Sequence, residues 1–68
     1  MKTLKKRLAM RLKRLREERG LTQDRLAKRS GVSHGYLERL EIGMHDPSLS
    51  TLKKLAKALK VTVAELVG

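Results

Sequence analysis

The chain has 68 residues and a mass of 7.7 kDa, which is enough for one small domain with a single core. It contains no cysteine, so disulfides, thiolate metal sites and a cysteine nucleophile are excluded. Lys and Arg number 17 against 7 Asp and Glu, for a net charge of +10, which indicates a polyanionic partner: nucleic acid first, an anionic membrane surface second. No run of apolar residues approaches the roughly 20 of a membrane span, and no secretory leader pattern follows Met1, so we expect a cytoplasmic protein.

The positive charge is concentrated near the amino terminus. Residues 1–19 hold nine of the Lys and Arg, residues 20–47 are balanced, and residues 48–68 carry a smaller excess. We expect residues 1–7 to form a basic arm or an extension of the first helix. The charge would then either serve a partner or only solvate a helix face. Tyr36 is the one aromatic residue, which argues against stacking of single-stranded bases.

Apolar spacing and capping residues predict five helices in chain order. The first carries Leu4, Leu8, Leu12 and Leu15 and ends at Gly20. The second extends from Gln23 to Arg29, and the third from His34 to about Ile42. The fourth carries Leu49, Leu52, Leu55, Ala56 and Leu59, and a short fifth ends near Leu66. The predicted N-caps are Thr22, Ser33, Ser48 and Thr62, the last in a capping box with Glu65. Because no segment alternates as a strand does, the predicted class is all-α.

Residues 23–42 have the pattern of a helix-turn-helix, in which two helices cross steeply and the second enters a DNA major groove. Ala27 is small where the helices would touch, and Gly31 suits the turn between them. The apolar anchors behind the motif would be Leu26, Val32, Leu37 and Leu40. Ser30 departs from the pattern, because its position is more often apolar.

Four strings within residues 8–66 resemble the Cro/CI-type (XRE-like) helix-turn-helix family of phage and bacterial repressors: LAMRLKRLREERGLTQ, DRLAKRSGVS, YLERLEIG and PSLSTLKKLAKALKVTVAEL. The resemblance implies a compact five-helix, lambda-repressor-like domain over residues 8–67, operator binding as a dimer, and control of transcription.

The helical wheel of the third helix groups Leu37, Leu40, Glu41 and Ser33 on the inner side, so the outward residues would meet the groove. Arg39 is the leading candidate for base recognition, because its guanidinium can donate to guanine O6 and N7 together. His34 would act from the first turn. Gly35 would permit close approach, unless it is only a cap or hinge. Glu38 would accept from a cytosine amino group, or merely orient a neighbouring Arg.

The predicted contacts to the DNA backbone are Gln23, Lys28, Ser33, Tyr36, Gly43 and Lys13. Gln23 begins a helix whose free N–H groups suit a phosphate, and the family's matching Gln bonds a phosphate or a base-contacting residue; the alternative is a solvent-facing side chain. Tyr36 would donate to a phosphate or be a partly buried aromatic. Residues 42–46 are nearly without positive charge, so this loop lacks side chains that would bind phosphate. We expect Lys13, Arg14, Lys28 and the amino-terminal cluster to supply the missing phosphate contacts.

Two further predictions concern structure. Arg16 and Glu41 lie on the inward edges of their helices, where charges are tolerated only as a pair, and the family typically joins these positions. Val63 and Val67 would either bury against a second copy or complete the core. A two-fold dimer would place its recognition helices at half-sites one turn apart, on a palindromic operator.

Other function classes find less support in the sequence. His34 and His45 belong to no metal-ligand spacing, and no phosphate-binding loop appears, so we expect no enzyme, metal, cofactor or small-molecule ligand. An antitoxin or accessory protein-binding regulator is the alternative, disfavoured because no tail follows the fifth helix. A membrane-surface peptide is disfavoured by the core pattern. The sequence therefore predicts a sequence-specific, double-stranded DNA-binding transcriptional regulator, most simply a repressor.

Overall fold

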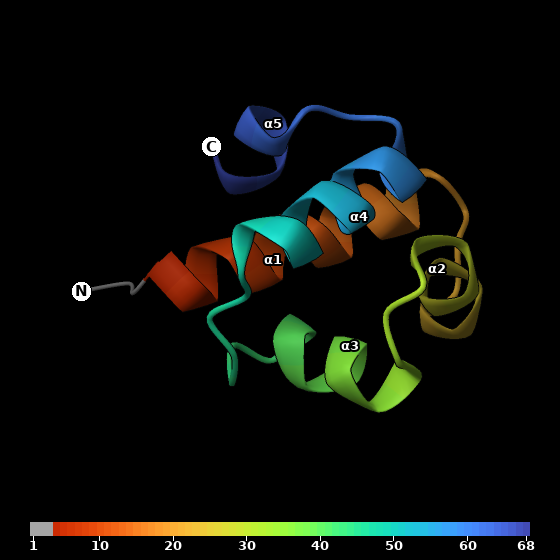
Figure 1. Ribbon diagram of the computed structural model, residues 1–68, viewed down its shortest axis with the longest axis horizontal. Coiled ribbons are helices and arrows are strands. Elements are labelled where there is room, and N and C mark those ends of the chain that lie inside the picture. The colour runs from red at the N-terminus through yellow and green to blue at the C-terminus, as the bar shows by residue number, and fades with distance from the viewer. Residues whose placement is uncertain (1–3) are drawn as a thin grey trace.

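The computed structural model describes residues 4–68, which form five α-helices with no strand among them (Figure 1). The helices are α1 (Leu4–Glu18), α2 (Gln23–Ser30), α3 (His34–Glu41), α4 (Leu49–Leu59) and α5 (Val63–Val67). The predicted all-α, five-helix class is confirmed. Within the predicted segment 1–7, residues 4–7 belong to α1 and so extend the first helix, whereas residues 1–3 lie outside the described part of the chain.

All four predicted N-caps are confirmed. The hydroxyls of Thr22, Ser33, Ser48 and Thr62 each accept from the backbone N–H three residues later, at 3.0–3.2 Å. Glu65 completes the capping box by accepting from the N–H of Thr62. A cap of this kind stabilises a protein by about 1 kcal/mol, so these contacts matter for helices as short as eight residues in α2 and α3.

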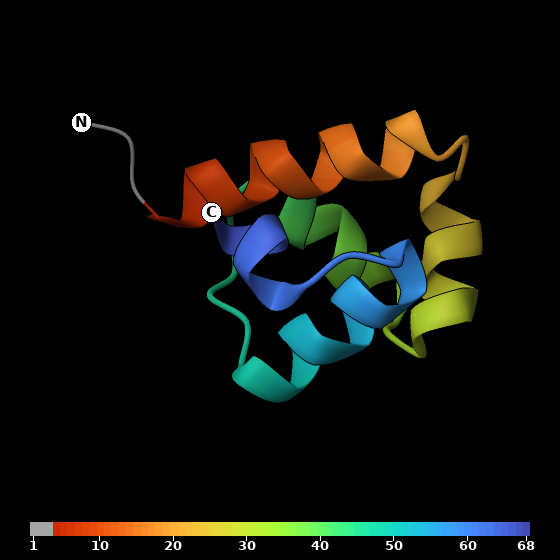
Figure 2. The same cartoon turned by 90° about the horizontal axis from the view of Figure 1, so that it is seen from above.

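Leucines from every helix fill the core. The largest fully buried side chains are Leu12, Leu26, Leu37, Leu40, Leu55, Leu59 and Leu66. α1 contacts α3 and α5, while α2 contacts α3 and α4. Figures 1 and 2 show α3 and α5 on opposite sides of the molecule, separated by α1 and α4. The helix-turn-helix and the last helix therefore present different surfaces.

The turn between α2 and α3 explains the departure at Ser30. Gly31 adopts a left-handed conformation with φ 76°, and its N–H donates to the Ala27 carbonyl at 2.9 Å. Ser30 is buried, but its hydroxyl donates to that carbonyl and accepts from the Val32 N–H, both at 3.3 Å. Because both polar functions are satisfied, a polar side chain is tolerated where an apolar one is usual.

Two predicted orientations differ in the structure. Ser33 was expected on the inner side of the third helix, yet it is exposed, because its hydroxyl caps the helix. Leu49, expected in the apolar stripe of the fourth helix, is 58% exposed in the first turn of α4, before that helix reaches the core. Among residues 4–68, no helix combines the length and apolar character needed to cross a bilayer.

Candidate nucleic-acid interface

The inner side of α3 is joined to α1 by the predicted ion pair. The Nε of Arg16 lies 2.7 Å from Glu41 Oε2, and its Nη2 donates to Oε1 at 3.0 Å. Arg16 Nη1 donates to the Leu21 carbonyl at 2.7 Å, and both charged side chains are buried. The hydrogen bond to Glu41 raises the pKa of Arg16 above its already high ordinary value, although burial opposes this. The pair therefore holds α3 against α1 with both charges satisfied.

Gln23 extends this network. Its Nε2 donates to Glu41 Oε1 at 3.1 Å, and the residue is half-buried at the start of α2. The side chain is therefore not an ordinary solvent-facing one, because it ties the second helix of the motif to the third. Its contact with a phosphate stays a prediction.

The outer side of α3 presents the four residues predicted to contact bases. His34, Glu38 and Arg39 are exposed, and Gly35 is half-buried. A Cβ at Gly35 would lie 3.5 Å from Arg39 Nη1 and 3.9 Å from Nη2, so the guanidinium lies over the glycine. α3 therefore combines a buried side that fixes its position with an outward side that carries hydrogen-bonding groups.

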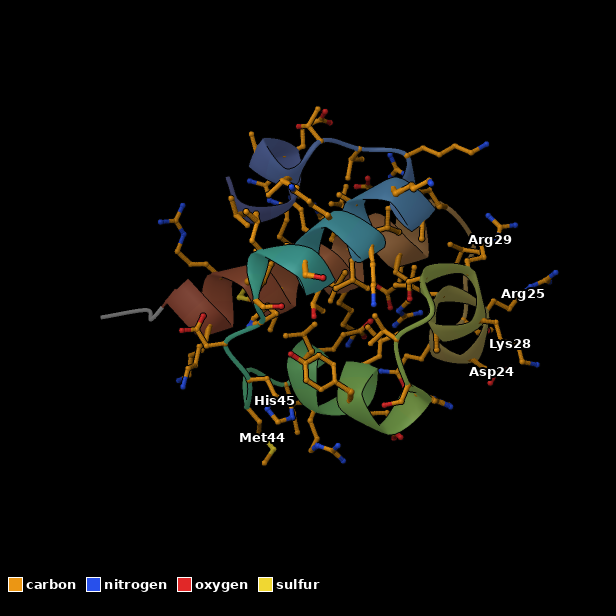
Figure 3. The ribbon with its side chains drawn as sticks, in the orientation of Figure 1. Asp24, Arg25, Lys28, Arg29, Met44 and His45 are labelled. Carbon is orange, nitrogen blue, oxygen red and sulfur yellow. The ribbon has the colours of Figure 1, made fainter. Side chains whose placement is uncertain are left out.

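The structure adds a residue that sequence reasoning missed. The His45 ring stacks on Tyr36 with centroids 4.6 Å apart and planes 4° from parallel. The Nε of Arg39 donates to His45 Nε2 at 3.1 Å. Figure 3 shows His45 beside α3, well away from the labelled side chains of α2. No periodicity places a loop histidine on a helix, so only the path of the loop could have shown this contact.

Gly43 directs that path. It has φ 80°, its N–H donates to the Leu40 carbonyl at 3.1 Å, and the next N–H, of Met44, reaches the Arg39 carbonyl at 3.0 Å. This is a Schellman cap, which requires a left-handed residue and turns the chain sharply after α3. The Gly43 N–H is used within this cap, and the predicted phosphate contact at Gly43 stays a prediction. Tyr36 is half-buried under His45, and its phosphate contact also stays a prediction.

Two of the predicted DNA contacts, Lys28 on α2 and His34 on α3, share the carboxylate of Asp24 on α2. Lys28 Nζ lies 3.1 Å from Asp24, and His34 Nδ1 lies 3.8 Å from it. Figure 3 shows Asp24 and Lys28 on the outer side of α2. All three side chains are exposed, and ion pairs of this kind contribute less than about 1 kcal/mol to stability. Lys28 and His34 could therefore exchange Asp24 for a DNA phosphate as their partner at little cost in free energy.

The basic residues of α1 are divided between two sides of the helix. A Cβ at Gly43 would lie 3.6 Å from the Cγ of Lys6, so Lys6 borders the loop after α3. Lys13 follows Lys6 by about two helical turns and lies on the same side. A second basic group, Arg7, Arg11 and Arg14, lines a hollow together with Met10 of α1 and with Val67 and Gly68 at the end of the chain. Arg14 also pairs with Glu18 at 3.7 Å, and its predicted compensation for the loop stays a prediction.

The remaining predicted residues lie outside this surface. Val63 and Val67 are half-buried and pack against the core, so the contacts observed are those of residues that complete it. Their role in a dimer stays a prediction. No group of three or more His, Asp or Glu within residues 4–68 is arranged to hold a metal ion.

Comparison with known proteins agrees with this geometry. A family model described as helix-turn-helix matches residues 12–66. The chain is 52% identical over 54 residues to the HTH-type transcriptional regulator y4dJ of Sinorhizobium fredii, covering 79% of this chain and 70% of that protein. It is 43% identical over 61 residues to the immunity repressor of Bacillus phage phi105, covering 90% of this chain but 42% of the repressor.

Solved structures show the same arrangement of helices. The restriction-modification controller protein C.AhdI of Aeromonas hydrophila superposes with a TM-score of 0.89 at 37% identity, covering 91% of this chain and 94% of that one. The clp gene regulator ClgR of Corynebacterium glutamicum superposes with a TM-score of 0.91 at 35% identity, covering 96% and 69% respectively.

Proposed function

Because the chain belongs to the helix-turn-helix family of transcriptional regulators, we propose that it binds double-stranded DNA at a specific sequence and represses transcription from the bound site. The relatives named as regulators and as a repressor support this proposal, as does the controller protein whose chain matches nearly end to end. The protein would act in the cytoplasm, without a catalytic step or a cofactor.

One observation carries the proposal: α3 is held by its inner side and open on its outer side. Leu37, Leu40 and Glu41 are buried, whereas His34 and Arg39 are exposed. A major groove about 12 Å wide admits one α-helix, and base edges there offer distinct donors and acceptors. Arg39 would select a guanine and His34 or Glu38 a neighbouring base. Lys13, Lys28, Ser33 and Gln23 would contact phosphates.

We further propose that two copies bind a palindromic operator. Val63 and Val67 belong to α5 and not to α3, so a contact through them would leave the recognition helix of each copy uncovered. A two-fold pair would present them to half-sites about 10–10.5 base pairs apart. Sedimentation equilibrium at the concentrations used for DNA binding would measure this association, and a monomer on an operator with a single half-site would contradict it.

The function is tested by selection from a random duplex library at about 150 mM salt, followed by competition of the selected sequence against bulk DNA. We expect an inverted-repeat motif bound at least ~10³-fold more tightly than bulk DNA. Flat selection with a steep salt dependence would mean electrostatic binding alone and would overturn the proposal. A protein partner, as in the antitoxin alternative, would then become the leading explanation.

A further inference from the structure

We propose that His45 is a positioning residue that orients Arg39 for recognition of a guanine. This inference rests on the proposed function, because it assigns the origin of specificity within the same surface. It adds a loop residue to the recognition of bases, which the sequence predicted from residues of the third helix alone.

The atoms used in the contact support this role. Arg39 donates to His45 through Nε, the guanidinium nitrogen nearest the side-chain stem. Nε is the one guanidinium nitrogen of Arg39 with a hydrogen-bond partner among residues 4–68. The outer edge of the fork, with Nη1 and Nη2, therefore keeps its donors for a ligand. That edge can donate to the O6 and N7 of a guanine at the same time.

His45 is itself held in place by a ring contact and by the course of its loop. Its ring lies parallel to that of Tyr36, 4.6 Å away between centroids, which restricts the imidazole plane. The Schellman cap at Gly43 sets the direction in which the loop leaves α3. With the plane and the loop both fixed, Nε2 faces Arg39 as an acceptor. It must then be the unprotonated nitrogen of a neutral ring, with the proton on Nδ1.

The position of the guanidinium over Gly35 completes the arrangement. Nη1 lies 3.5 Å from where a Cβ would be, so the side chain folds along the outer side of α3. A free arginine on an exposed helix samples many rotamers and loses that freedom on binding. Because His45 restricts Arg39 before DNA arrives, less conformational entropy is lost when the complex forms.

Two substitutions distinguish the role of His45 as a hydrogen-bond acceptor from its stacking on Tyr36. His45→Phe keeps a ring on Tyr36 but removes the acceptor, whereas His45→Gln supplies an amide oxygen to Arg39 without an aromatic ring. We expect His45→Phe to lower discrimination at the Arg39 base pair by about tenfold, within the range a bidentate contact provides. Affinity for bulk DNA should stay within about twofold, because phosphate contacts determine it. His45→Gln should retain most of the discrimination.

A double-mutant cycle and a matched control complete the test. In an Arg39→Ala background, His45→Phe should have no further effect on discrimination, because the two residues act as a unit. Met44→Ala alters the exposed neighbour of His45 in the same loop and should leave discrimination unchanged. In the DNA-free protein, NMR should show the Arg39 Nε–H protected from solvent exchange in the wild type and in His45→Gln, and unprotected in His45→Phe.

Several results would overturn the inference. Equal weakening on all sequences by His45→Phe would mean a phosphate contact instead. Unchanged discrimination in His45→Phe, additive effects in the double variant, or an unprotected Nε–H in the wild type would each remove the positioning role. If the wild type selects no motif, the proposed function itself fails. A selected motif with unaffected His45 variants removes this inference alone.

Discussion

Gly35 and Arg39 are one helical turn apart on the outer side of α3, and the Arg39 guanidinium lies over the glycine there. The glycine costs the helix stability, because Gly is less favourable than Ala in a helix by about 0.8–1.0 kcal/mol. Within residues 4–68 no contact requires its small size, since an added Cβ would make only ordinary van der Waals contact with Arg39. The absence of a side chain at Gly35 is therefore explained by the approach of a partner to the helix and not by contacts within the chain.

Gly35→Ala tests that explanation. We expect the free energy of unfolding in urea to rise by about 1 kcal/mol, from helix propensity alone. Affinity for the selected operator should fall by about tenfold or more, because the methyl group would separate the helix from the base edges. A more stable variant with undiminished operator affinity would contradict close approach at Gly35 and favour a hinge or capping role.

At the scale of the helices, one buried ion pair joins α3 to α1 in addition to the leucine core. Glu41→Gln removes the negative charge and leaves Arg16 buried without its partner, which should cost about 3–5 kcal/mol. Total stability for 68 residues is about 3–10 kcal/mol, so most of it should be lost. Urea unfolding monitored by circular dichroism measures this.

Glu38→Gln is the matched control for the ion pair. Glu38 is exposed on the same helix, so the same change of side chain should alter stability by no more than about 0.5 kcal/mol. Equal effects of the two substitutions would mean that Arg16 and Glu41 contribute no more than a surface pair.

The end of α4 contains a strained residue. Lys60 has φ 59°, and among the residues whose φ is described it is the one non-glycine in the left-handed region. That conformation costs an L-residue about 1–2 kcal/mol, so Lys60→Gly should stabilise the protein by about 1 kcal/mol in thermal or urea unfolding. Lys57→Gly, inside the same helix, should instead destabilise it by about 1 kcal/mol. A loss of stability in Lys60→Gly would show that the backbone of Lys60 is not strained.

At the scale of the whole molecule, the charge of α1 is divided between the side that borders α3 and the side that borders α5. Lys13→Ala and Lys28→Ala should each flatten the slope of log K against log salt by about one charge on every sequence. Arg14→Ala should leave the slope unchanged, because Arg14 lies beside α5. An equal effect of Arg14 and Lys13 would show that the DNA extends around α1 to its far side.

Local patterns in the sequence were enough to predict the helices and their caps. The leucine spacing, the four Ser and Thr caps and the turn at Gly31 act within a few residues of chain, where steric and hydrogen-bonding preferences are strong. The Arg16–Glu41 pair was also predictable, because a charge on an inward edge requires a partner. The class, the boundaries and the buried side of α3 follow from such preferences.

The neighbours of the exposed side chains could not be predicted in this way. His45 contacts Tyr36 and Arg39 because a Schellman cap bends the loop back along α3, and Gln23 turns to Glu41 because α2 crosses α3 at a particular angle. Lys6 and Arg14 are separated because α3 and α5 pack on different sides of α1.

The sequence by itself determined the five helices, their order and the side of α3 that is buried, because these depend on spacing along one chain. Only the tertiary structure decided which groups surround Arg39 and which lysines border α3. Those contacts join residues on different elements, and their distances depend on how the leucine core packs the helices together.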